Sequence, residues 1–500
     1  MEVKVERRIR LTETPCDELI VPLWTGELLA EVYPELDQAF AGGLSELQEE
    51  EEIKGEAKSV SIIHTMGRMA AKKLIVIGMG APEKFQFQLA REAWGRAAKT
   101  VLAKGKEKSV AIDLPVTKRM PSERLAQALT EAFGLADYRY EGYRQKAKQE
   151  AESVAEVRLL ASEEAEEAVF AGVVRGLALV AGTNLARTLV NEPANYLPPR
   201  VLKEMAVEVA NRHGMGVEVL DLEKMKEMGM GGVLSVAQGS AEEPYLVAIR
   251  YQGRETWDDV IGLVGKGVTF DTGGISLKPA AGMERMKSDM GGAAAVLGVM
   301  EALGRLRPQA NVLAVIGLVE NMPSGTAYRP GDIITTLSGK TVEIISTDAE
   351  GRLVLADCIT YAKQQGVGCL IDAATLTGGI TIALGNTCTG AMTNNQKLVE
   401  ELLAAAEEAG ERLWQLPTFE EYAELNKSLV ADLKNSGGRP AQSITAAMFL
   451  KEFAGETPWV HLDIAGTAFA QSASDMQPVG GTGVMTRTIT QFVTNRSKND

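Results

Sequence analysis

Histidine is scarce in this sequence. Only three histidines, His64, His213 and His461, occur among 500 residues. That number excludes a metal site built from several histidines and leaves little basis for a Ser-His-Asp triad. We therefore expect any metal site to be rich in oxygen ligands, which on hardness alone suit magnesium or manganese. His461 lies in an apolar run, and we interpret it as a buried structural histidine.

Cysteines are also few, and the usual features of secreted or membrane proteins are lacking. The four cysteines lie far apart without C-x-x-C spacing, which indicates reduced thiols in a cytosolic setting. The N-terminal residues alternate in charge and contain no apolar signal-peptide core. No run of about eighteen uncharged apolar residues occurs, since even residues 169–181 are interrupted by Arg175. We predict a soluble, cytoplasmic protein without a membrane partner.

The charge balance argues against another class of partner. The chain has 52 basic and 67 acidic side chains, a formal net charge of −15. Such a surplus of negative charge repels the phosphate backbone of nucleic acids. With 45% apolar and 24% charged residues, the composition is that of an ordinary globular protein. Nucleic acid is therefore a poor candidate ligand.

The length of the chain predicts more than one domain, because 500 residues exceed what a single hydrophobic core usually organises. Two short apolar runs within residues 74–114 flank a helical stretch near residues 88–102, which predicts a β-α-β unit with parallel strands. Residues 136–167 are polar and charged, and we interpret them as a helical connector and hinge. We place a smaller N-terminal α/β domain at residues 1–160 and a larger catalytic α/β domain at residues 161–500.

The second domain alternates predicted strands with predicted helices. The strands are expected at residues 217–220, 245–251, 260–264, 312–319, 341–346 and 369–373. The helices are expected near residues 162–189, 201–212, 291–306 and 353–364. This order predicts a mostly parallel central sheet covered by helices on both faces. Ligands of such sheets bind beyond the carboxyl ends of the strands.

Two short runs carry a concentration of acidic residues: residues 264–293, VGKGVTFDTGGISLKPAAGMERMKSDMGGA, and residues 346–353, STDAEGRL. Asp348 and Glu350 are two positions apart and would point to one side if the chain leaves a strand in extended form. Asp271 and Asp289 each lie beside glycines, which allow close approach of the backbone. Four converging carboxylates repel one another, and a pair of divalent metal ions would relieve that repulsion.

The same runs carry basic residues with different expected roles. Lys266 follows the predicted strand at 260–264 and is a candidate metal ligand in its neutral form, which desolvation makes reachable. Lys278 is expected to stay charged and to stabilise negative charge on a carbonyl oxygen. Arg352 cannot lose its proton, so it should bind an anion. Any one acid taken alone would more often be a loop residue or helix cap, as Asp289 could be for the following helix.

Ordered blocks of the sequence resemble the signature blocks of the leucyl aminopeptidase family, also called cytosol aminopeptidases, which are dinuclear metallo-exopeptidases. The resemblance extends from about residue 160 onward. Its blocks are VGKGVTFDTGGISLK, MKSDMGGAA, TDAEGRL, NEPAN at 191–195, ATLTG at 374–378 and HLDIAG at 461–466. Several long blocks in the same order are a far more specific signal than one short motif.

The resemblance implies a ligand set for two divalent ions, zinc first with manganese able to substitute. Lys266 and Asp289 would bind one ion and Asp348 the other. Asp271 and Glu350 would bridge both ions, and a hydroxide between the ions would be the nucleophile.

The resemblance also implies roles for residues around the reacting carbonyl. Lys278 would polarise the scissile carbonyl, and Arg352 would hold a bicarbonate that serves as general base. The backbone N–H of Leu376 would contact the bound substrate, and Met286 would line the pocket for the first side chain. The family usually has asparagine where this chain has Ser346, which puts any hydrogen bond of that asparagine in doubt.

We therefore predict a metal-dependent aminopeptidase that removes leucine or another large apolar residue from peptides with a free N-terminus. The resemblance also implies a homohexamer. Two alternatives stay open. One is a non-catalytic role in DNA binding, against which the acidic charge argues. The other is a dinuclear phosphatase, since clustered carboxylates with two metal ions also serve phosphoryl transfer.

Overall fold

The computed structural model describes residues 2–102, 108–114, 117, 120–144 and 156–497. The chain divides into two compact units, Met1–Val180 with Ser472–Pro478, and Ala181–Gln471 with Val479–Asp500. This division falls inside helix α6 (Glu166–Asn191). The domain boundary near residue 160 stays a prediction, and residues 145–155 of the predicted hinge lie outside the described residues.

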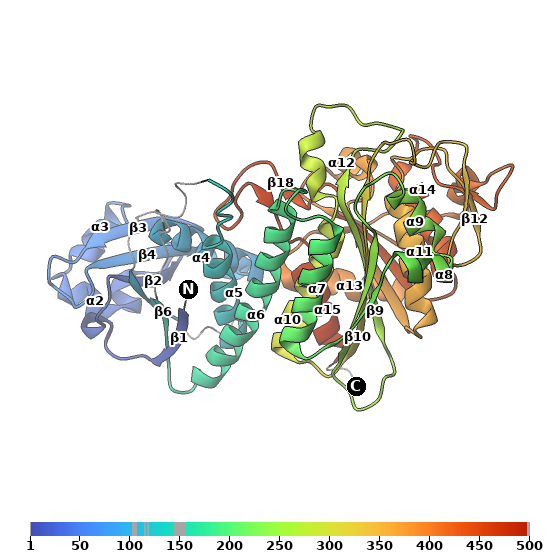
Figure 1. Cartoon of the computed structure of the whole chain (residues 1–500). Coiled ribbons are helices and arrows are strands. Elements are labelled where there is room, and N and C mark those ends of the chain that lie inside the picture. The colour runs from blue at the N-terminus through green and yellow to red at the C-terminus, as the bar shows by residue number, and fades with distance from the viewer. Residues whose placement is uncertain (1, 103–107, 115–116, 118–119, 145–155, 498–500) are drawn as a thin grey trace. The chain divides into compact units, whose positions relative to one another are not determined.

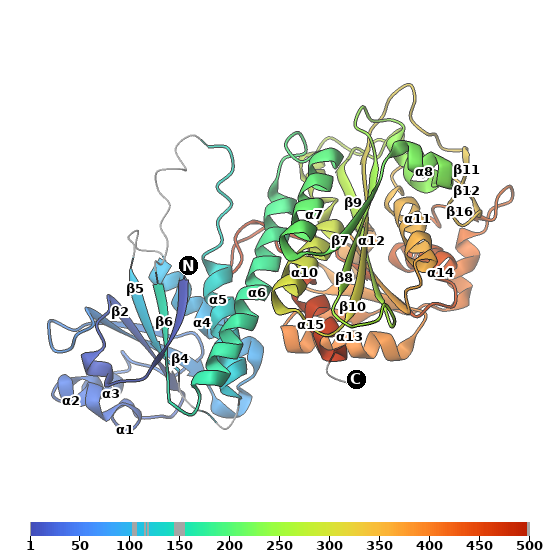
Figure 2. The same cartoon turned by 60° about the horizontal axis from the view of Figure 1, so that its bottom comes forward.

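The first unit contains a six-stranded mixed sheet in the order β1-β6-β5-β2-β4-β3. Its strands are β1 (Glu2–Arg7), β2 (Glu18–Trp24), β3 (Val60–His64), β4 (Lys73–Gly80), β5 (Ser109–Asp113) and β6 (Glu156–Ala161). The predicted β-α-β unit is present as β4, α4 (Phe87–Leu102) and β5, and β2 lies between its two strands. Helix α5 (Ser122–Ala136) packs beside α4 (Figure 2).

Strand β6 corrects the prediction of a helical connector over residues 136–167. Residues 156–161 pair in parallel with β1 on one side and with β5 on the other. Val157 and Leu159 are fully buried, and so are the last two residues of the strand, Leu160 and Ala161. Pairing on both sides therefore makes this segment a strand, although the composition around it is polar.

The second unit is built on an eight-stranded sheet in the order β15-β14-β17-β13-β9-β10-β8-β7. Its strands are β7 (Gly216–Leu220), β8 (Tyr245–Gln252), β9 (Ile261–Asp271), β10 (Asn311–Asn321), β13 (Cys369–Ala374), β14 (Thr389–Thr393), β15 (Leu413–Gln415) and β17 (Trp459–Asp463). The four central strands, β17, β13, β9 and β10, run parallel. The predicted mostly parallel sheet is thus confirmed.

Helices cover both faces of this sheet, as predicted (Figure 1). One core forms between one face of the sheet and helices α7 (Pro199–His213), α10 (Gly291–Leu306), α13 (Gln396–Ala409) and α15 (Thr486–Arg496). The other core forms under helices α9 (Gly231–Ala237), α11 (Gly351–Gln364) and α14 (Gln442–Ala454). Both faces are apolar because the central strands are buried on both sides.

Residues 341–346 do not join the central sheet, contrary to prediction. They form the short strand β12 (Thr341–Glu343), which pairs with β11 (Ile333–Thr335) and β16 (Leu433–Lys434) in a separate three-stranded sheet. The strand ends early because the next residues turn under the side chain of Asn435, which accepts hydrogen bonds from the N–H groups of Ile345 and Ser346. This small sheet carries the second acidic run.

Helix α6 is the one helix of the described ranges that is long and apolar enough to cross a membrane by length and composition. Its apolar side chains have a different explanation. Val169 and Val173 belong to the core of the first unit, whereas Leu189 and Val190 belong to a core of the second. The helix is therefore a core helix that is apolar around much of its circumference.

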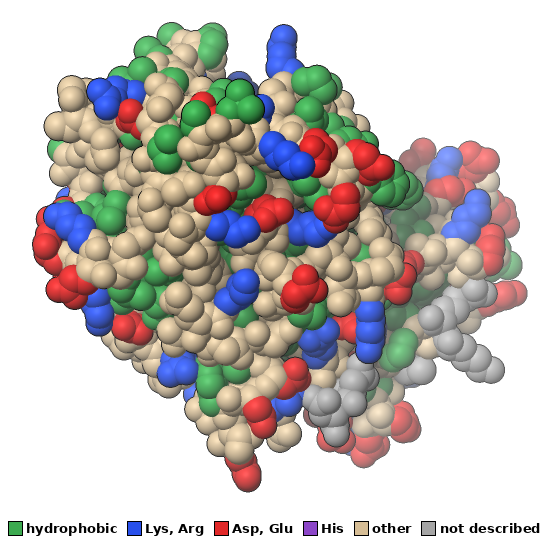
Figure 3. Space-filling model, turned by 90° about the vertical axis from the view of Figure 1, so that its right-hand side faces the viewer, with side chains coloured by type: hydrophobic (Ala, Val, Ile, Leu, Met, Phe, Trp, Pro, Cys, Tyr) green, Lys and Arg blue, Asp and Glu red, His purple; other side chains and the backbone are tan. Residues whose placement is uncertain are grey.

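Charged side chains on the face of the second unit shown in Figure 3 are of both signs. Lysine and arginine side chains lie among aspartate and glutamate side chains and do not gather in one basic patch on that face. A basic patch or stripe is the usual footprint of a nucleic-acid-binding surface, and this face does not present one (Figure 3).

Asp357 on helix α11 holds two neighbouring segments in place. Its side chain is fully buried, and its Oδ1 and Oδ2 accept hydrogen bonds from the N–H groups of Leu337 at 2.8 Å and Val233 at 3.0 Å. Burial raises the pKa of this carboxyl to about 7, although those backbone donors and that of Gly232 favour the charged form. The folded protein therefore keeps a proton on Asp357 in mildly acidic solution.

We expect this proton to make stability depend on pH. The folded-state pKa of Asp357 lies above the ordinary value of 3.8. The bound proton therefore stabilises the folded state fully below pH 3.8, and this stabilisation is lost as the pH rises through about 7. We compare the unfolding free energy of wild type with that of Asp357→Asn. The difference between them should fall by on the order of 1 kcal/mol per pH unit between about pH 5 and 7. Urea unfolding of both proteins across this range measures it. A difference that is independent of pH would contradict a raised pKa of Asp357 in the folded protein.

Candidate metal centre

The first acidic run lies at the carboxyl end of the parallel strands. Strand β9 continues to Asp271, its last residue, so Lys266 lies within the strand and not beyond its end as predicted. The strand is longer because Val268 and its neighbours keep pairing with β10. The register shifts between Val319 and Asn321 of β10, where β9 has one extra residue, and this bulge sets Asp271 opposite Asn321.

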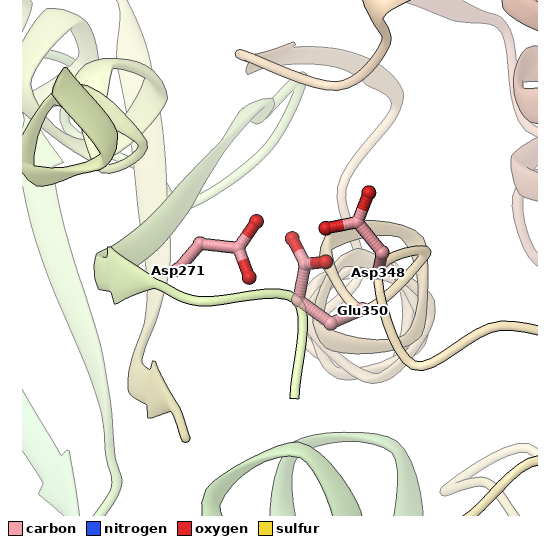
Figure 4. A group of neighbouring side chains, drawn as sticks. All are labelled: Asp271, Asp348 and Glu350. Carbon is pink, nitrogen blue, oxygen red and sulfur yellow. The ribbon is translucent and has the colours of Figure 1, made fainter. Parts of the chain in front are cut away.

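The second run reaches the same place by a different route from the one expected. Thr347 and Asp348 form a turn, and Glu350 immediately precedes helix α11, so this segment is not extended. The carboxylates of Asp271, Asp348 and Glu350 nevertheless point toward one another (Figure 4). One ligand oxygen from each lies within 4.8 Å of the others. The turn into a helix thus brings together the acids that the sequence pattern singled out.

Two lysine side chains lie among these acids. Nζ of Lys266 is 2.7 Å from Asp289 Oδ2 and 2.8 Å from Glu350 Oε1. Nζ of Lys278 is 2.8 Å from Asp271 Oδ2 and also contacts Asp348. Each ammonium therefore lies between two carboxylates.

The electrostatics of the cluster are those of buried charges in close pairs. Burial opposes the charged form of both lysines, but the surrounding carboxylates outweigh it and raise the pKa of Lys266 and of Lys278. Burial also raises the pKa of Asp289, Asp348 and Glu350 above the usual range of carboxyl groups. Lys266 is thus protonated in this arrangement, and coordination of a metal through Nζ requires the loss of that proton.

Asp289 is held by the loop that follows β13. It lies directly after the turn of 3-10 helix at Met283–Ser288 and close to the start of α10. Oγ1 of Thr375 donates a hydrogen bond of 2.8 Å to Asp289 Oδ1, and the Thr375 carbonyl accepts one of 3.0 Å from Lys266 Nζ. The residue preceding α10 is Met290, and its side chain makes no capping hydrogen bond. The two carboxylate oxygens of Asp289 are therefore held by Thr375 and Lys266.

Close approach of the backbone at the start of α10 depends on Gly292. A Cβ atom added there would lie 1.9 Å from the carbonyl oxygen of Ala373 on β13. Any other residue would push α10 away from the sheet. The prediction that glycines beside the acids allow close approach of the backbone is confirmed at Gly292.

Arg352 lies at the start of α11 and is buried. Its Nε has no hydrogen-bond partner among the described residues. Burial lowers the pKa of Arg352 to about 10, while Glu350 and Asp463 act in the opposite direction. A buried guanidinium with an unsatisfied donor suits a bound anion.

All nine residues singled out in the sequence line one cavity of about 470 Å³. They are Lys266, Asp271, Lys278, Met286, Asp289, Asp348, Glu350, Arg352 and Leu376. The N–H of Leu376 donates a hydrogen bond of 3.3 Å to Asp463 Oδ1, so this group already has a protein acceptor. The structure brings the nine residues together, and their individual roles stay predictions.

Several side chains that support the cluster were not singled out in the sequence. Asn321 donates to Asp271, Asn435 holds the backbone around Ser346, and Asp463 holds the loop at Leu376. Asn321 and Asp463 end strands β10 and β17 at the same edge of the sheet, which is the signal that could have revealed them. His461 is fully buried, with its Nδ1 2.6 Å from Asp372 Oδ1, in agreement with a structural role.

Ser346, at the position where the family usually has asparagine, makes a local hydrogen bond. Its Oγ accepts a hydrogen bond of 3.3 Å from the N–H of Asp348. Asn435 donates 2.7 Å to the carbonyl of Ser346 and 3.3 Å to that of Ala349. The amide that orders this turn therefore comes from the segment after β16.

The residues of the cluster fit divalent metal ions. Four carboxylates face only two lysine ammonium groups, so negative charge is left over. The buried Oε2 of Glu350 has no hydrogen-bond partner within the described part of the chain. Carboxylate oxygens around an electronegative cavity are suitable ligands for manganese and, with a lysine nitrogen, for zinc.

Comparison with known proteins gives the family. Residues 184–490 match the catalytic domain of the cytosol aminopeptidase family, and residues 20–147 match its N-terminal domain. The structure of the bottromycin maturation enzyme BotP in complex with Mn is similar, with 33% identity and a TM-score of 0.85 over 96% of this chain and 99% of that one. A mutant of tomato leucine aminopeptidase has 32% identity and a TM-score of 0.88 over 99% of this chain and 96% of that one.

These matches cover both units and agree with the sequence blocks and with the acidic cluster. The expectation drawn from those blocks is confirmed: the chain belongs to the cytosol aminopeptidase family of metallopeptidases.

Proposed function

We propose that this protein removes the N-terminal residue of peptides, preferring leucine or another large apolar residue, with the help of two divalent metal ions. The observation that carries the proposal is the convergence of Asp271, Asp348 and Glu350 within 4.8 Å beside two lysines in one cavity. Membership of an aminopeptidase family supports it. The similar structure of BotP is a complex with Mn, which supports manganese, and the mixed nitrogen and oxygen ligand set supports zinc.

Each ion would have its own ligands and would share others. Lys266 and Asp289 would hold one ion, Asp348 would hold the other, and Asp271 and Glu350 would be shared. When bound, the ions supply a water nucleophile activated at neutral pH and polarise the scissile carbonyl.

The remaining steps fall to side chains of the chain itself. The ammonium group of Lys278 would stabilise negative charge that develops on the carbonyl oxygen, because its raised pKa keeps it protonated at neutral pH. Arg352 would hold an anion such as bicarbonate, which could accept a proton as general base. For Leu376 to offer its N–H to the substrate, the 3.3 Å bond to Asp463 must be exchanged.

The preference for an apolar first residue rests on the lining of the cavity. Met283, Met286, Ala468 and Phe469 face it together with the polar cluster. Apolar walls beside polar groups that fix orientation are the usual arrangement in a site for a leucine-like side chain. Of the two relatives, one is named for leucine and the other for bottromycin maturation, so leucine is the first substrate to test.

We further infer, from the family resemblance, a homohexamer in the cytoplasm. Sedimentation velocity of the purified protein at micromolar concentration tests the assembly. A species of six chains is expected, and a monomer would contradict the inference.

Removal of metal should abolish activity. We expect the chelator-treated protein to lose hydrolysis of leucyl p-nitroanilide and to regain it on addition of Mn²⁺ or Zn²⁺. Glu350→Ala should lower kcat by at least about 1,000-fold and reduce the bound metal, because a shared ligand is lost. Metal analysis and circular dichroism, measured on the same sample, separate loss of metal from loss of fold.

Glu284→Gln is the matched control for Glu350→Ala, because Glu284 also lies near the cavity but is exposed, and it has a 3.7 Å contact with Arg285. It should keep wild-type metal content and activity. Full turnover by Glu350→Ala would rule out the proposed function.

Replacing Lys278 should separate catalysis from metal binding. In Lys278→Met we expect about 100- to 1,000-fold lower kcat, as for the loss of a charge-stabilising donor. Metal content should be retained, since five ligands remain. Steady-state kinetics and metal analysis measure the two effects. Unchanged kcat would show that Lys278 is only a counter-ion of the acids.

A further inference from the structure

Asn321 is in direct contact with a proposed metal ligand and is fully buried. Its Nδ2 donates hydrogen bonds of 2.8 Å to Asp271 Oδ1 and 3.0 Å to the carbonyl oxygen of Thr347. Both acceptors are oxygens, so the amide must present its nitrogen to them. One amide group thus joins the end of β9 to the turn that carries Asp348.

The hydrogen bonds to Asp271 leave its two oxygens in different situations. Oδ1 accepts from Asn321 and also from the N–H of Gly273 at 2.9 Å. Oδ2 lies 2.8 Å from Nζ of Lys278, and Asp271 lines the cavity. Asn321 and the N–H of Gly273 therefore hold Oδ1 together, and Oδ2 is the oxygen left for a cation.

The position of Asn321 itself is fixed from its own backbone. Its carbonyl accepts hydrogen bonds from the N–H of Thr272 at 3.0 Å and from Thr272 Oγ1 at 2.9 Å. The turn is held from its other side by Asn435, but that residue touches none of the carboxylates. Asn321 thus connects a carboxylate of one acidic run with the backbone of the other, and it shares the Thr347 carbonyl with the hydroxyl of Tyr328, which donates a hydrogen bond of 2.8 Å to it.

We propose that Asn321 is a positioning residue of the metal centre, which orients Asp271 and fixes the Asp348 turn beside it for divalent metal ions. This inference rests on the proposed function. Outer-shell hydrogen bonds of this kind typically change metal affinity by about 10- to 100-fold when they are removed.

The chain offers a matched control at the opposite end of the same strand. Asn311 is the first residue of β10, as Asn321 is the last, and both are fully buried. Asn311 Nδ2 also donates two hydrogen bonds, to the carbonyl oxygens of Thr256 at 2.7 Å and Asp258 at 2.8 Å. Asn311→Ala removes the same groups from the same strand without touching the acidic cluster.

The test is calorimetric titration of Mn²⁺ into chelator-treated, full-length wild type, Asn321→Ala and Asn311→Ala, with thermal unfolding of the metal-free proteins. We expect both variants to unfold at lower temperature than wild type. Mn²⁺ affinity should fall about 10- to 100-fold in Asn321→Ala and change less than about 3-fold in Asn311→Ala. If Asn321→Ala does not fold, Asn321→Ser, whose shorter side chain cannot reach both acceptors, is titrated in its place.

The two ways of failing are distinguishable. In the first, wild type binds Mn²⁺ and the Asn321 variant binds it as tightly as the Asn311 variant. This result would overturn only the positioning role of Asn321. Wild type that binds neither Mn²⁺ nor Zn²⁺ would overturn the proposed function and this inference with it.

Discussion

Repulsion between buried carboxylates is the constraint on which the second unit depends. Asp271, Asp289 and Glu350 are almost fully removed from solvent, and burial of an unpaired carboxylate is strongly unfavourable. The chain meets this cost with lysine ammonium groups 2.7–2.8 Å away and with directed hydrogen bonds from Asn321 and Thr375. A protein that only needed stability would place apolar side chains here, so the retained charge points to a function.

The architecture supplies the rigidity that such a cluster needs. Lys266 and Asp271 come from the end of β9, which extends past its pairing with β13 at Gly265 and stays paired in parallel with β10 as far as Asp271. Asp289 and Glu350 lie at the starts of α10 and α11, which cover opposite faces of the sheet. Sites built on sheet and helix ends hold their geometry better than sites on long loops. The acids therefore lie together because the end of β9 and the starts of α10 and α11 meet at the same edge of the sheet.

Much of this arrangement could be predicted from sequence, for definite reasons. Glycine-flanked acids in ordered blocks indicated the cluster, and the alternation of strands and helices indicated the sheet. Pattern reading failed where long-range contacts decide local structure: β6 is a strand because it fits between β1 and β5, and the turn at Asp348 is set by Asn435, some 86 to 90 positions away. Asn321 was missed because the predicted strand at 312–319 ended two residues short, so Asn321 was not recognised as the end of β10.

The extra residue in β9 has a consequence for how this site could change over time. Side chains of a strand point alternately to the two faces of the sheet. The number of residues between Val268 and Asp271 therefore determines the face to which the Asp271 carboxylate points. Loss or gain of a single codon in that interval would turn Asp271 away from Asn321 and set Phe270 or Thr272 in its place. Substitutions of residues around the acids, such as Asn321, can tune this centre gradually, whereas a change in strand length would remove Asp271 from it in one step.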